Sequence, residues 1–205
     1  MVNASDNDKG AHGSGFFAML ARMKYISRWA LMRNTERENL SEHSLETAFI
    51  AHALAVIRRD VFGGSADPER IAVYAMYHDA PEILTGDMPT PVKYFTPGLR
   101  SAYAEVEKKA GERLLDMLPE ELRPAYRDLL VPDESSYEHR CVKAADKLSA
   151  LIKCIEERKA GNMEFSAAER STLEALRAMD MPEAEYFLEN FIPAYSLTLD
   201  ASFGS

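Results

Sequence analysis

The amino-acid sequence predicts an all-α protein with a single domain. Its 205 residues, 46% of them hydrophobic, are enough for one compact domain with a sizeable core. Apolar residues recur at helical spacing in segment after segment, and no stretch shows the strict alternation typical of a half-buried strand. No internal repeat or linker divides the chain. We therefore expect one domain over residues 16–205, preceded by a flexible polar tail over residues 1–15 that lacks the apolar core of a signal peptide.

The helical pattern covers several segments with recognisable ends. They span residues 16–27, 39–60, 67–80, 99–118, 137–161, 166–179 and 182–197. Asn39 and Glu42 have the spacing of a capping box at the start of the second segment. Asp67 suits the N-cap of the third segment, and Pro68 suits its first helical position. Gly161 suits the position just beyond the end of the segment 137–161.

Two faces of the segment 39–60 carry apolar residues at helical spacing. One face contains Leu45, Ala48, Phe49, Ala53 and Val56, and the other contains His43, Thr47, Ile50, Leu54 and Ile57. We expect both faces to contribute to the core. His43 should therefore point inward, and His52 should be a hydrogen-bonded core histidine.

The composition argues against several classes of function. A formal net charge of −9 disfavours a nucleic-acid polymer as the main partner, because such binders usually present a basic face. No apolar run approaches the roughly 18 residues that a membrane-spanning helix needs. Cys141 and Cys154 fall in one predicted helix, roughly 20 Å apart and too far for a disulfide. We expect both to pack in the core of a cytoplasmic protein.

The stretch MYHDAPEILTGDMPTP, residues 76–91, places a histidine and several carboxylates where a helix should break. His78 continues the buried face of its helix. Pro81 has no N–H and disfavours helical backbone before it, so the helix should end at or just after Asp79. At a helix end, His78 and Asp79 could converge on one cation, which the negative end of the helix dipole also favours. Glu82 then begins the next segment beside that cation without having to bind it.

A metal site needs further ligands, and His43 and Asp146 are the candidates. Two imidazoles and two carboxylates suit Mn, Fe, Co, Ni or Zn better than Ca or Mg. Each residue also has a simpler explanation, with His43 as a core histidine and Asp146 as a surface ion-pair partner of Lys143. Spacing alone leaves a metal site and a polar turn both open.

The order of these motifs resembles a known family. EHSL, YHDAPEILTGD and KAADKL follow one another as in the HD-domain superfamily, whose metal ligands arrive as H…HD…D on a helical bundle. The blocks RWALMRN, ENLSEHSLETA, AMYHDAPEILTGDMPTPVKYF and EYFLENFIPAYSLTLD look like the bacterial 5′-deoxynucleotidases of the YfbR type. The resemblance covers residues 16–200 and implies a single-domain, HD-type helical bundle.

The resemblance also implies an activity and the residues that perform it. Such enzymes hydrolyse deoxyribonucleoside 5′-monophosphates to deoxyribonucleosides and phosphate by attack of a metal-activated water, commonly with cobalt or manganese, and form homodimers. The positions that match the metal ligands are His43, His78, Asp79 and Asp146. Glu82 matches the catalytic carboxylate, and Arg28 matches the arginine that orients the phosphate. The positions that match substrate contacts are Arg28, Trp29, His43, Asp79, Asp87, Met88, Pro89, Thr90 and Asp146.

Two alternatives to this function stay open at the level of sequence. An HD-superfamily phosphohydrolase could act on another nucleotide, cyclic or triphosphate, because Arg33, Arg37 and Lys93 lie near the motifs and could bind further phosphates. A non-enzymatic, metal-stabilised helical interaction module could carry the same ligands. Loss of Glu82 or Arg28 would abolish function in an enzyme and leave it intact in such a module.

Overall fold

The computed structural model describes residues 13–202, and every regular element within that range is a helix. An isolated antiparallel bridge joins Ser27 and Asn39. The prediction of an all-α protein is therefore confirmed. The predicted tail over residues 1–15 falls mostly on residues 1–12, which lie outside the described residues.

The described chain forms α-helices joined by short helical turns. In chain order these are α1 (Phe16–Leu20), η1 (Ala21–Tyr25), α2 (Leu40–Val56), the π-helical turn η2 (Ile57–Val61), α3 (Pro68–Tyr77), α4 (Glu82–Thr85), α5 (Thr90–Lys93), α6 (Pro97–Asp116), η3 (Glu120–Leu122), α7 (Arg123–Leu130), α8 (Tyr137–Lys159), η4 (Met163–Phe165), α9 (Ser166–Arg177), α10 (Pro182–Asn190), η5 (Ile192–Ser196) and α11 (Leu199–Ser202). The long helices α2, α3, α6, α8 and α9 match predicted segments to within a few residues. The segments predicted as single helices over residues 16–27 and 182–197 are each divided, into α1 and η1 and into α10 and η5. The short helices α5, α7 and α11 were not predicted, because a helix of one or two turns shows too little periodicity.

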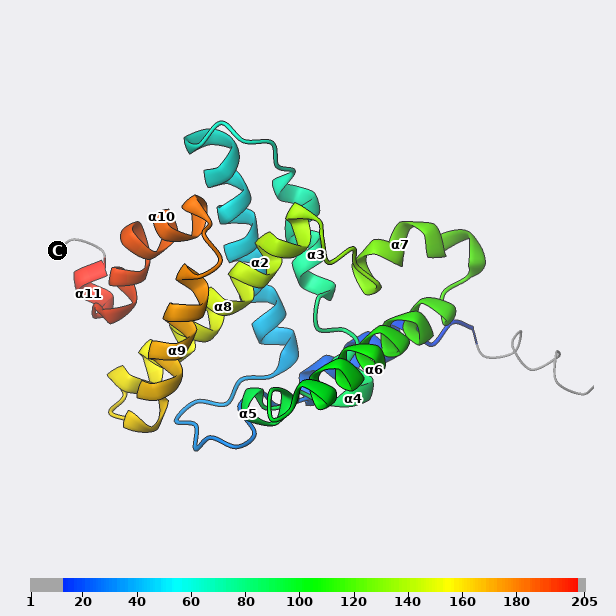
Figure 1. Cartoon of the computed structure of the whole chain (residues 1–205), viewed down its shortest axis with the longest axis horizontal. Helices are drawn as coiled ribbons and strands as arrows, with labels where there is room; N and C mark the ends of the chain where they lie inside the picture. Colours follow the sequence, from blue (N-terminus) through cyan, green and yellow to red (C-terminus); the bar gives the residue numbers. More distant parts are fainter. Residues whose placement is uncertain (1–12, 203–205) are drawn as a thin grey trace, which may run out of the picture.

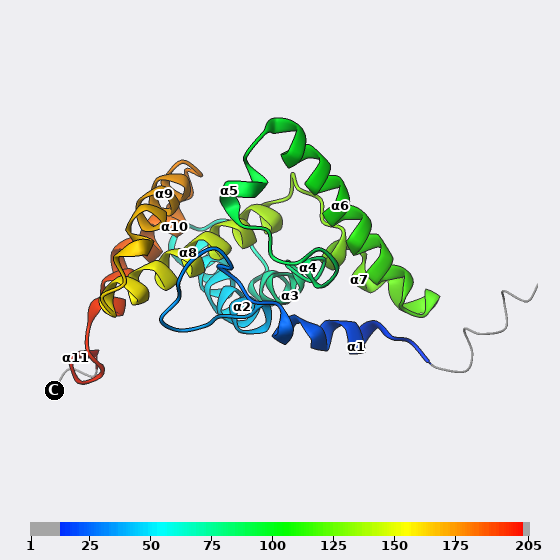
Figure 2. The ribbon, with the colours of Figure 1, turned by 90° about the horizontal axis from the view of Figure 1, so that it is seen from below.

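Helices α2 and α8 cross at the centre of the molecule, and α3 packs along α2 (Figure 1). Helices α9 and α10 lie to one side of this pair, and α6 and α7 lie to the other (Figure 2). Buried side chains form two clusters. The larger cluster joins α2, α3, α8 and α10, and the smaller joins α1, η1, α6 and α7 with Leu40, Ala80 and Ile83. The turn that follows α3 runs from the first cluster to the second.

The predicted helix ends are confirmed. The side chain of Asn39 accepts hydrogen bonds from the backbone of Ser41 and Glu42, and the side chain of Glu42 accepts one from the backbone of Asn39. Asp67 caps α3 by accepting from the backbone of Arg70, with Pro at the first helical position. Helix α8 ends at Lys159 with Ala160 as its C-cap, and Gly161 follows the cap in the left-handed region, with φ at 88°. These local signals fix where α2, α3 and α8 begin or end.

One expectation about α2 is wrong. The face that contains His43, Thr47 and Ile50 is buried, but Leu45 is 49% exposed and Phe49 is 66% exposed. His52, expected in the core, is also exposed. Helix α2 is apolar on almost all sides, so its periodicity does not single out the face that packs against α3 and α8.

The two cysteines behave as predicted. Both are free, buried side chains of α8. Burial raises the pKa of each thiol to about 12, which keeps both protonated and unreactive at neutral pH. Within residues 13–202, the structure contains no helix long and apolar enough to cross a membrane.

Candidate metal and phosphate site

The turn between α3 and α4 places His78 and Asp79 at a helix end. Helix α3 stops at Tyr77, and the backbone N–H of His78 donates to the carbonyl of Ala75 at 3.4 Å. The backbone N–H of Glu82 donates to the carbonyl of Asp79 at 3.0 Å and starts the next short helix. The predicted break before Pro81 is therefore confirmed, and the turn directs both His78 and Asp79 inward.

His78 is held with one nitrogen free. Its Nδ1 lies 2.7 Å from the carbonyl oxygen of Ala75 and donates its proton there. The lone pair is then on Nε2, which is buried, has no hydrogen-bond partner among the described residues, and lies 3.2 Å from Asp79 Oδ2. A buried nitrogen whose tautomer is fixed by a backbone carbonyl suits metal coordination.

Helices α2 and α8 bring the other two predicted ligands to the same place. His43 Nε2 lies 3.1 Å from Asp146 Oδ1 and 3.5 Å from Asp79 Oδ2. One ligand atom each of His43, His78 and Asp146 lie within 4.8 Å of one another. The Asp146 carboxylate faces His43 and is not confined to a surface ion pair, although the charge of Lys143 also acts on it. This set of imidazoles and carboxylates fits a divalent transition-metal ion.

The electrostatics of this cluster favour a positive charge between the carboxylates. Burial opposes ionisation of Asp79 and Asp146, but the neighbouring imidazoles, together with Lys143 in the case of Asp146, outweigh it and hold the pKa of both carboxyls below the usual value. Burial and the nearby Arg28 lower the pKa of His43, but hydrogen bonds to Asp146 and Glu38 raise it to about 9. The carboxylates therefore stay charged and draw a cation to the site.

Arg28 lies directly beside the carboxylates of Asp79 and Asp146. Its Nη1 is 3.3 Å from Asp79 Oδ2, and its Nη2 is 4.0 Å from Asp146 Oδ1. Burial opposes its charge, but these carboxylates raise the pKa of Arg28 further above neutrality. A permanently charged, planar fork at this position can bind a phosphate next to the metal ligands.

Glu82 lies at the start of α4 and is almost fully buried. Its Oε2 has no hydrogen-bond partner within the described part of the chain. Burial first, and then the charges of Asp79 and Asp87, raise the pKa of Glu82 to about 10. A positive charge bound beside Asp79 would lower this pKa toward neutrality, where the carboxyl could exchange a proton with water.

The predicted nucleoside-binding residues are partly brought together. The backbone N–H of Trp29 donates to Asp87 Oδ2 at 3.2 Å, and the Trp29 indole packs on Phe165 with ring centroids 5.3 Å apart. Trp29 has φ at 59°, a left-handed backbone that is uncommon for a bulky residue and is often found at functional sites. The segment from Met88 to Thr90 follows Asp87 and leads into α5, half-buried at Met88 and exposed at Thr90.

The sequence prediction missed Glu38. Its carboxylate contacts Arg28, Trp29 and His43, all of them predicted site residues. Glu38 opens the block ENLSEHSLETA and directly precedes the capping residue Asn39, but the motif by itself assigns it no role. The contacts depend on the Ser27–Asn39 bridge, which closes the chain on itself and could not be foreseen from spacing.

Comparison with known proteins assigns the family. Residues 15–195 match the family described as 5′-deoxynucleotidase YfbR-like. The chain belongs to this YfbR-like family. A 5′-deoxynucleotidase of Vibrio cholerae is 53% identical over 192 residues, which cover 91% of this chain and 97% of the relative. The protein is accordingly an enzyme, and the non-enzymatic alternative is set aside.

Solved structures share the fold. An HD-domain phosphohydrolase from Listeria innocua superposes with a TM-score of 0.77 at 27% identity and covers 88% of this YfbR-like chain and 87% of its own. The HD phosphohydrolase DatZ of cyanophage S-2L was solved with dA and one catalytic Zn²⁺ ion. It has a TM-score of 0.62 at 19% identity, and the match covers 86% of this chain and 95% of DatZ. The single-domain HD-type helical bundle is confirmed.

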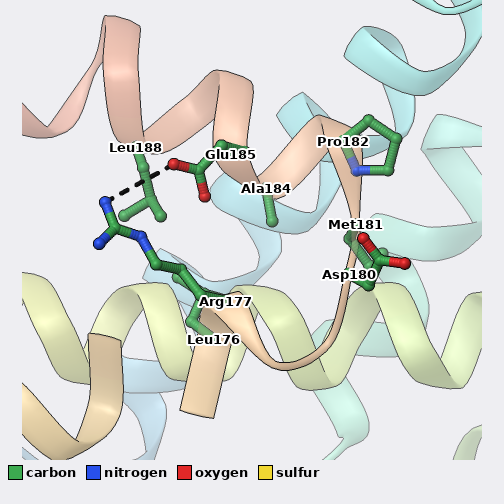
Figure 3. A pocket seen from close by; sticks show the side chains of 8 residues that line it. All are labelled: Leu176, Arg177, Asp180, Met181, Pro182, Ala184, Glu185 and Leu188. Carbon is green, nitrogen blue, oxygen red and sulfur yellow. Dashed lines mark ion pairs between the residues drawn. The ribbon is translucent and has the colours of Figure 1, made fainter. Parts of the chain in front are cut away.

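A separate hollow of about 190 Å³ lies between the end of α9 and the start of α10 (Figure 3). Arg177 and Glu185 form an ion pair across it at 3.6 Å, and the apolar side chains of Leu176 and Met181 line its floor. None of the predicted site residues lines this hollow. The hollow is thus separate from the cluster of His43, His78, Asp79 and Asp146.

Proposed function

We propose that this protein is a metal-dependent 5′-deoxynucleotidase that works at the cluster around His78. It hydrolyses deoxyribonucleoside 5′-monophosphates to deoxyribonucleosides and phosphate. The observation that carries this proposal is the convergence of the HD pair with His43 and Asp146, with Arg28 within 3.3 Å of Asp79. Membership of the YfbR-like family supports the substrate class.

In this proposal His43, His78, Asp79 and Asp146 hold the divalent ion. Bound there, the ion supplies charge neutralisation and an acidified water near neutral pH. Cobalt or manganese is the proposed physiological metal, and zinc is also compatible with two imidazoles and two carboxylates. The same ligand side chains His43, Asp79 and Asp146 lie where the phosphate would meet the ion.

Arg28 and Glu82 act on the reacting groups. The guanidinium of Arg28 binds the phosphate oxygens and stabilises the charge that they share during hydrolysis. Glu82 orients the attacking water and takes its proton, because its buried Oε2 has a free lone pair beside the ligand carboxylates. Hydrolysis of a phosphate monoester is slow without help, so positioning and charge stabilisation must supply most of the rate.

The nucleoside lies against the segment from Asp87 to Thr90 and the indole of Trp29. Trp29 and Asp87 are already joined by a hydrogen bond, so the two halves of the pocket form one surface. Asp87 can accept a hydrogen bond from the sugar 3′-hydroxyl, while Met88, Pro89 and Thr90 supply shape. A tight wall formed by Trp29 near C2′ would reject the additional hydroxyl of ribose.

We further propose a cytoplasmic homodimer. Two free, buried thiols suit a reducing compartment. The exposed apolar side chains of α2 offer a surface that a second copy would cover.

The test is phosphate release by metal-stripped protein that is resupplied in turn with Co²⁺, Mn²⁺, Mg²⁺ and Zn²⁺. The substrates are dAMP, AMP, the 3′ isomer of dAMP, and dATP. We expect cobalt- or manganese-dependent release from dAMP, much less from AMP, and loss of at least about 100-fold in Glu82→Ala. Release from dATP in place of dAMP would replace this proposal with a triphosphate hydrolase, and full activity in Glu82→Ala would remove Glu82 from the mechanism.

A further inference from the structure

Glu38 is a half-buried carboxylate at the end of the loop over residues 27–39. Its Oε2 accepts from the indole Nε1–H of Trp29 at 2.8 Å and lies 3.5 Å from Arg28 Nε. Its Oε1 lies 3.3 Å from His43 Nδ1. One side chain thus contacts a proposed nucleoside-binding residue, the phosphate-binding arginine and a metal ligand.

These contacts are not needed to close the loop. Its two ends are joined by backbone hydrogen bonds, from Arg28 N to Glu38 O at 3.0 Å and from Leu40 N to Ile26 O at 3.0 Å. Its middle is held by Glu157, which accepts from the backbone of Thr35 and Glu36. The side chain of Glu38 is therefore available for a functional role, because the backbone around it is fixed independently.

The contact with His43 decides which imidazole nitrogen is free. When a metal ion binds, the carboxylate beside Nδ1 favours the tautomer that keeps the proton on Nδ1, so Nε2, which faces Asp79 and Asp146, is the nitrogen available to coordinate the ion. The two carboxylate oxygens of Glu38 face different partners, Oε1 toward His43 and Oε2 toward Trp29, so Glu38 can accept from both side chains together.

We propose that Glu38 is a positioning residue that couples the metal site to the substrate-binding loop through His43, Arg28 and Trp29. The inference rests on the proposed function for the roles of these residues. Because Glu38 touches both sites, metal binding at His43 and the orientation of the Trp29 indole become linked, and each should affect the other. The coupling contributes both to metal affinity and to binding of the nucleotide.

The chain provides its own reporter, because Trp29 is its one tryptophan. Titration of metal-free protein with Co²⁺ or Mn²⁺ should change the fluorescence of this indole, and a diamagnetic ion such as Zn²⁺ should do so without paramagnetic quenching. The variant is Glu38→Gln, which keeps the shape but removes the charge. The matched control is Glu36→Gln, an exposed position two residues away in the same loop.

In Glu38→Gln we expect the metal dissociation constant, measured by chelator competition, to rise at least about tenfold. The zinc-induced fluorescence change should be largely lost even at saturating metal, and KM for dAMP should rise. Glu36→Gln should match the wild type in metal affinity, in the zinc-induced fluorescence change and in KM for dAMP. Ser149→Ala, which removes the neighbour 3.2 Å from His43 Nδ1, should keep the fluorescence response at saturation because Ser149 does not contact Trp29.

Several outcomes would overturn the coupling. One is a Glu38→Gln protein with wild-type metal affinity and fluorescence response. Another is a wild-type protein that binds zinc without any change at Trp29. Circular dichroism and the thermal midpoint of each variant separate a misfolded protein from an uncoupled one, and Glu38→Asp supplies a second, charge-retaining variant that should recover part of the metal affinity. Metal affinity and Trp29 fluorescence are measured without substrate. The coupling can therefore be confirmed even if the protein does not hydrolyse dAMP and the proposed function is wrong.

Discussion

At the residue scale, the site is marked by buried polar atoms without partners. His78 Nε2 and Glu82 Oε2 are both buried and accept no hydrogen bond within the described residues. Leaving such an atom unsatisfied costs about 1–3 kcal/mol. Other buried atoms in the described part of the chain, such as Ser166 Oγ, also lack a partner, but His78 Nε2 and Glu82 Oε2 are the ones that lie beside the Asp79 carboxylate or next to it in the turn, where the proposed ion and water would satisfy them.

The substitution Arg28→Lys tests whether the planar shape of the guanidinium matters for phosphate binding, because lysine keeps the positive charge but has no planar fork. The guanidinium reaches Asp79 and Asp146 with different nitrogens, and one ammonium cannot make both contacts and also bind two phosphate oxygens. We expect Arg28→Lys to lower kcat/KM for dAMP by about 10–100-fold, the value of one or two charged hydrogen bonds.

The measurement is steady-state phosphate release, with Arg33→Lys as the matched control on the exposed part of the same loop. Equal losses in both variants would mean that Arg28 contributes only net charge. Metal affinity should change little in Arg28→Lys, since the arginine is not a ligand.

At the element scale, the substrate loop depends on the end of α8. Glu157 is 2% exposed and accepts hydrogen bonds from Lys153, from Asn162 and from the backbone of Thr35 and Glu36. Lys153 also donates to the carbonyl of Glu36 at 2.6 Å. The helix end therefore anchors the middle of the loop that carries Arg28 and Trp29.

Acid should weaken this anchor at a defined pH. Burial alone would raise the pKa of Glu157, but the hydrogen bonds from Lys153, Thr35 and Asn162 outweigh it and lower the pKa to about 2 from 4.5. A lowered pKa in the folded state stabilises the protein above the unfolded value, and the stabilisation is lost as the pH falls from about 4.5 to about 2.

We expect Glu157→Gln to reduce the free energy of unfolding by up to about 3 kcal/mol at neutral pH, and by much less near pH 3. Urea unfolding of both proteins at several pH values, followed by Trp29 fluorescence and circular dichroism, measures this difference. A difference that stays constant from pH 7 to pH 3 would contradict the ionic anchor. The exposed Glu164→Gln is the control and should match the wild type throughout.

At the scale of the whole molecule, the features that could be predicted from the sequence are those set by residues close together in the chain. The capping box at Asn39, the glycine at the end of α8 and the break before Pro81 are local signals, and all three are confirmed. The four candidate metal ligands came from the resemblance of the ordered motifs to a known family, and the structure brings these side chains together. Glu38 and Glu157 act across a loop closed by long-range contacts, which spacing along the chain does not encode.

The exposed face of α2 was predicted wrongly for a different reason. This face is also a candidate surface for contact between two copies of the protein. Helix α2 and helix α3 pack side by side (Figure 1), and Leu45, Phe49, Val73 and Met76 are each 42–66% exposed on these two helices. The periodicity assigned part of this surface to the core because it is as apolar as the core. An apolar surface of this kind is typical of an interface between protein chains.

If this face joins two copies in the proposed homodimer, a charge placed on it should separate them. Burying a carboxylate against apolar partners without a counter-charge is unfavourable by several kcal/mol, so Phe49→Glu should give a monomer of 23.0 kDa where the wild type elutes at twice that mass. Size-exclusion chromatography with light scattering measures the mass. Val106→Glu is the control, because Val106 is 49% exposed on α6, away from α2, and should leave the dimer intact. A wild type that is already monomeric would contradict the proposed homodimer. A Phe49→Glu protein that is still dimeric would show that the interface lies elsewhere.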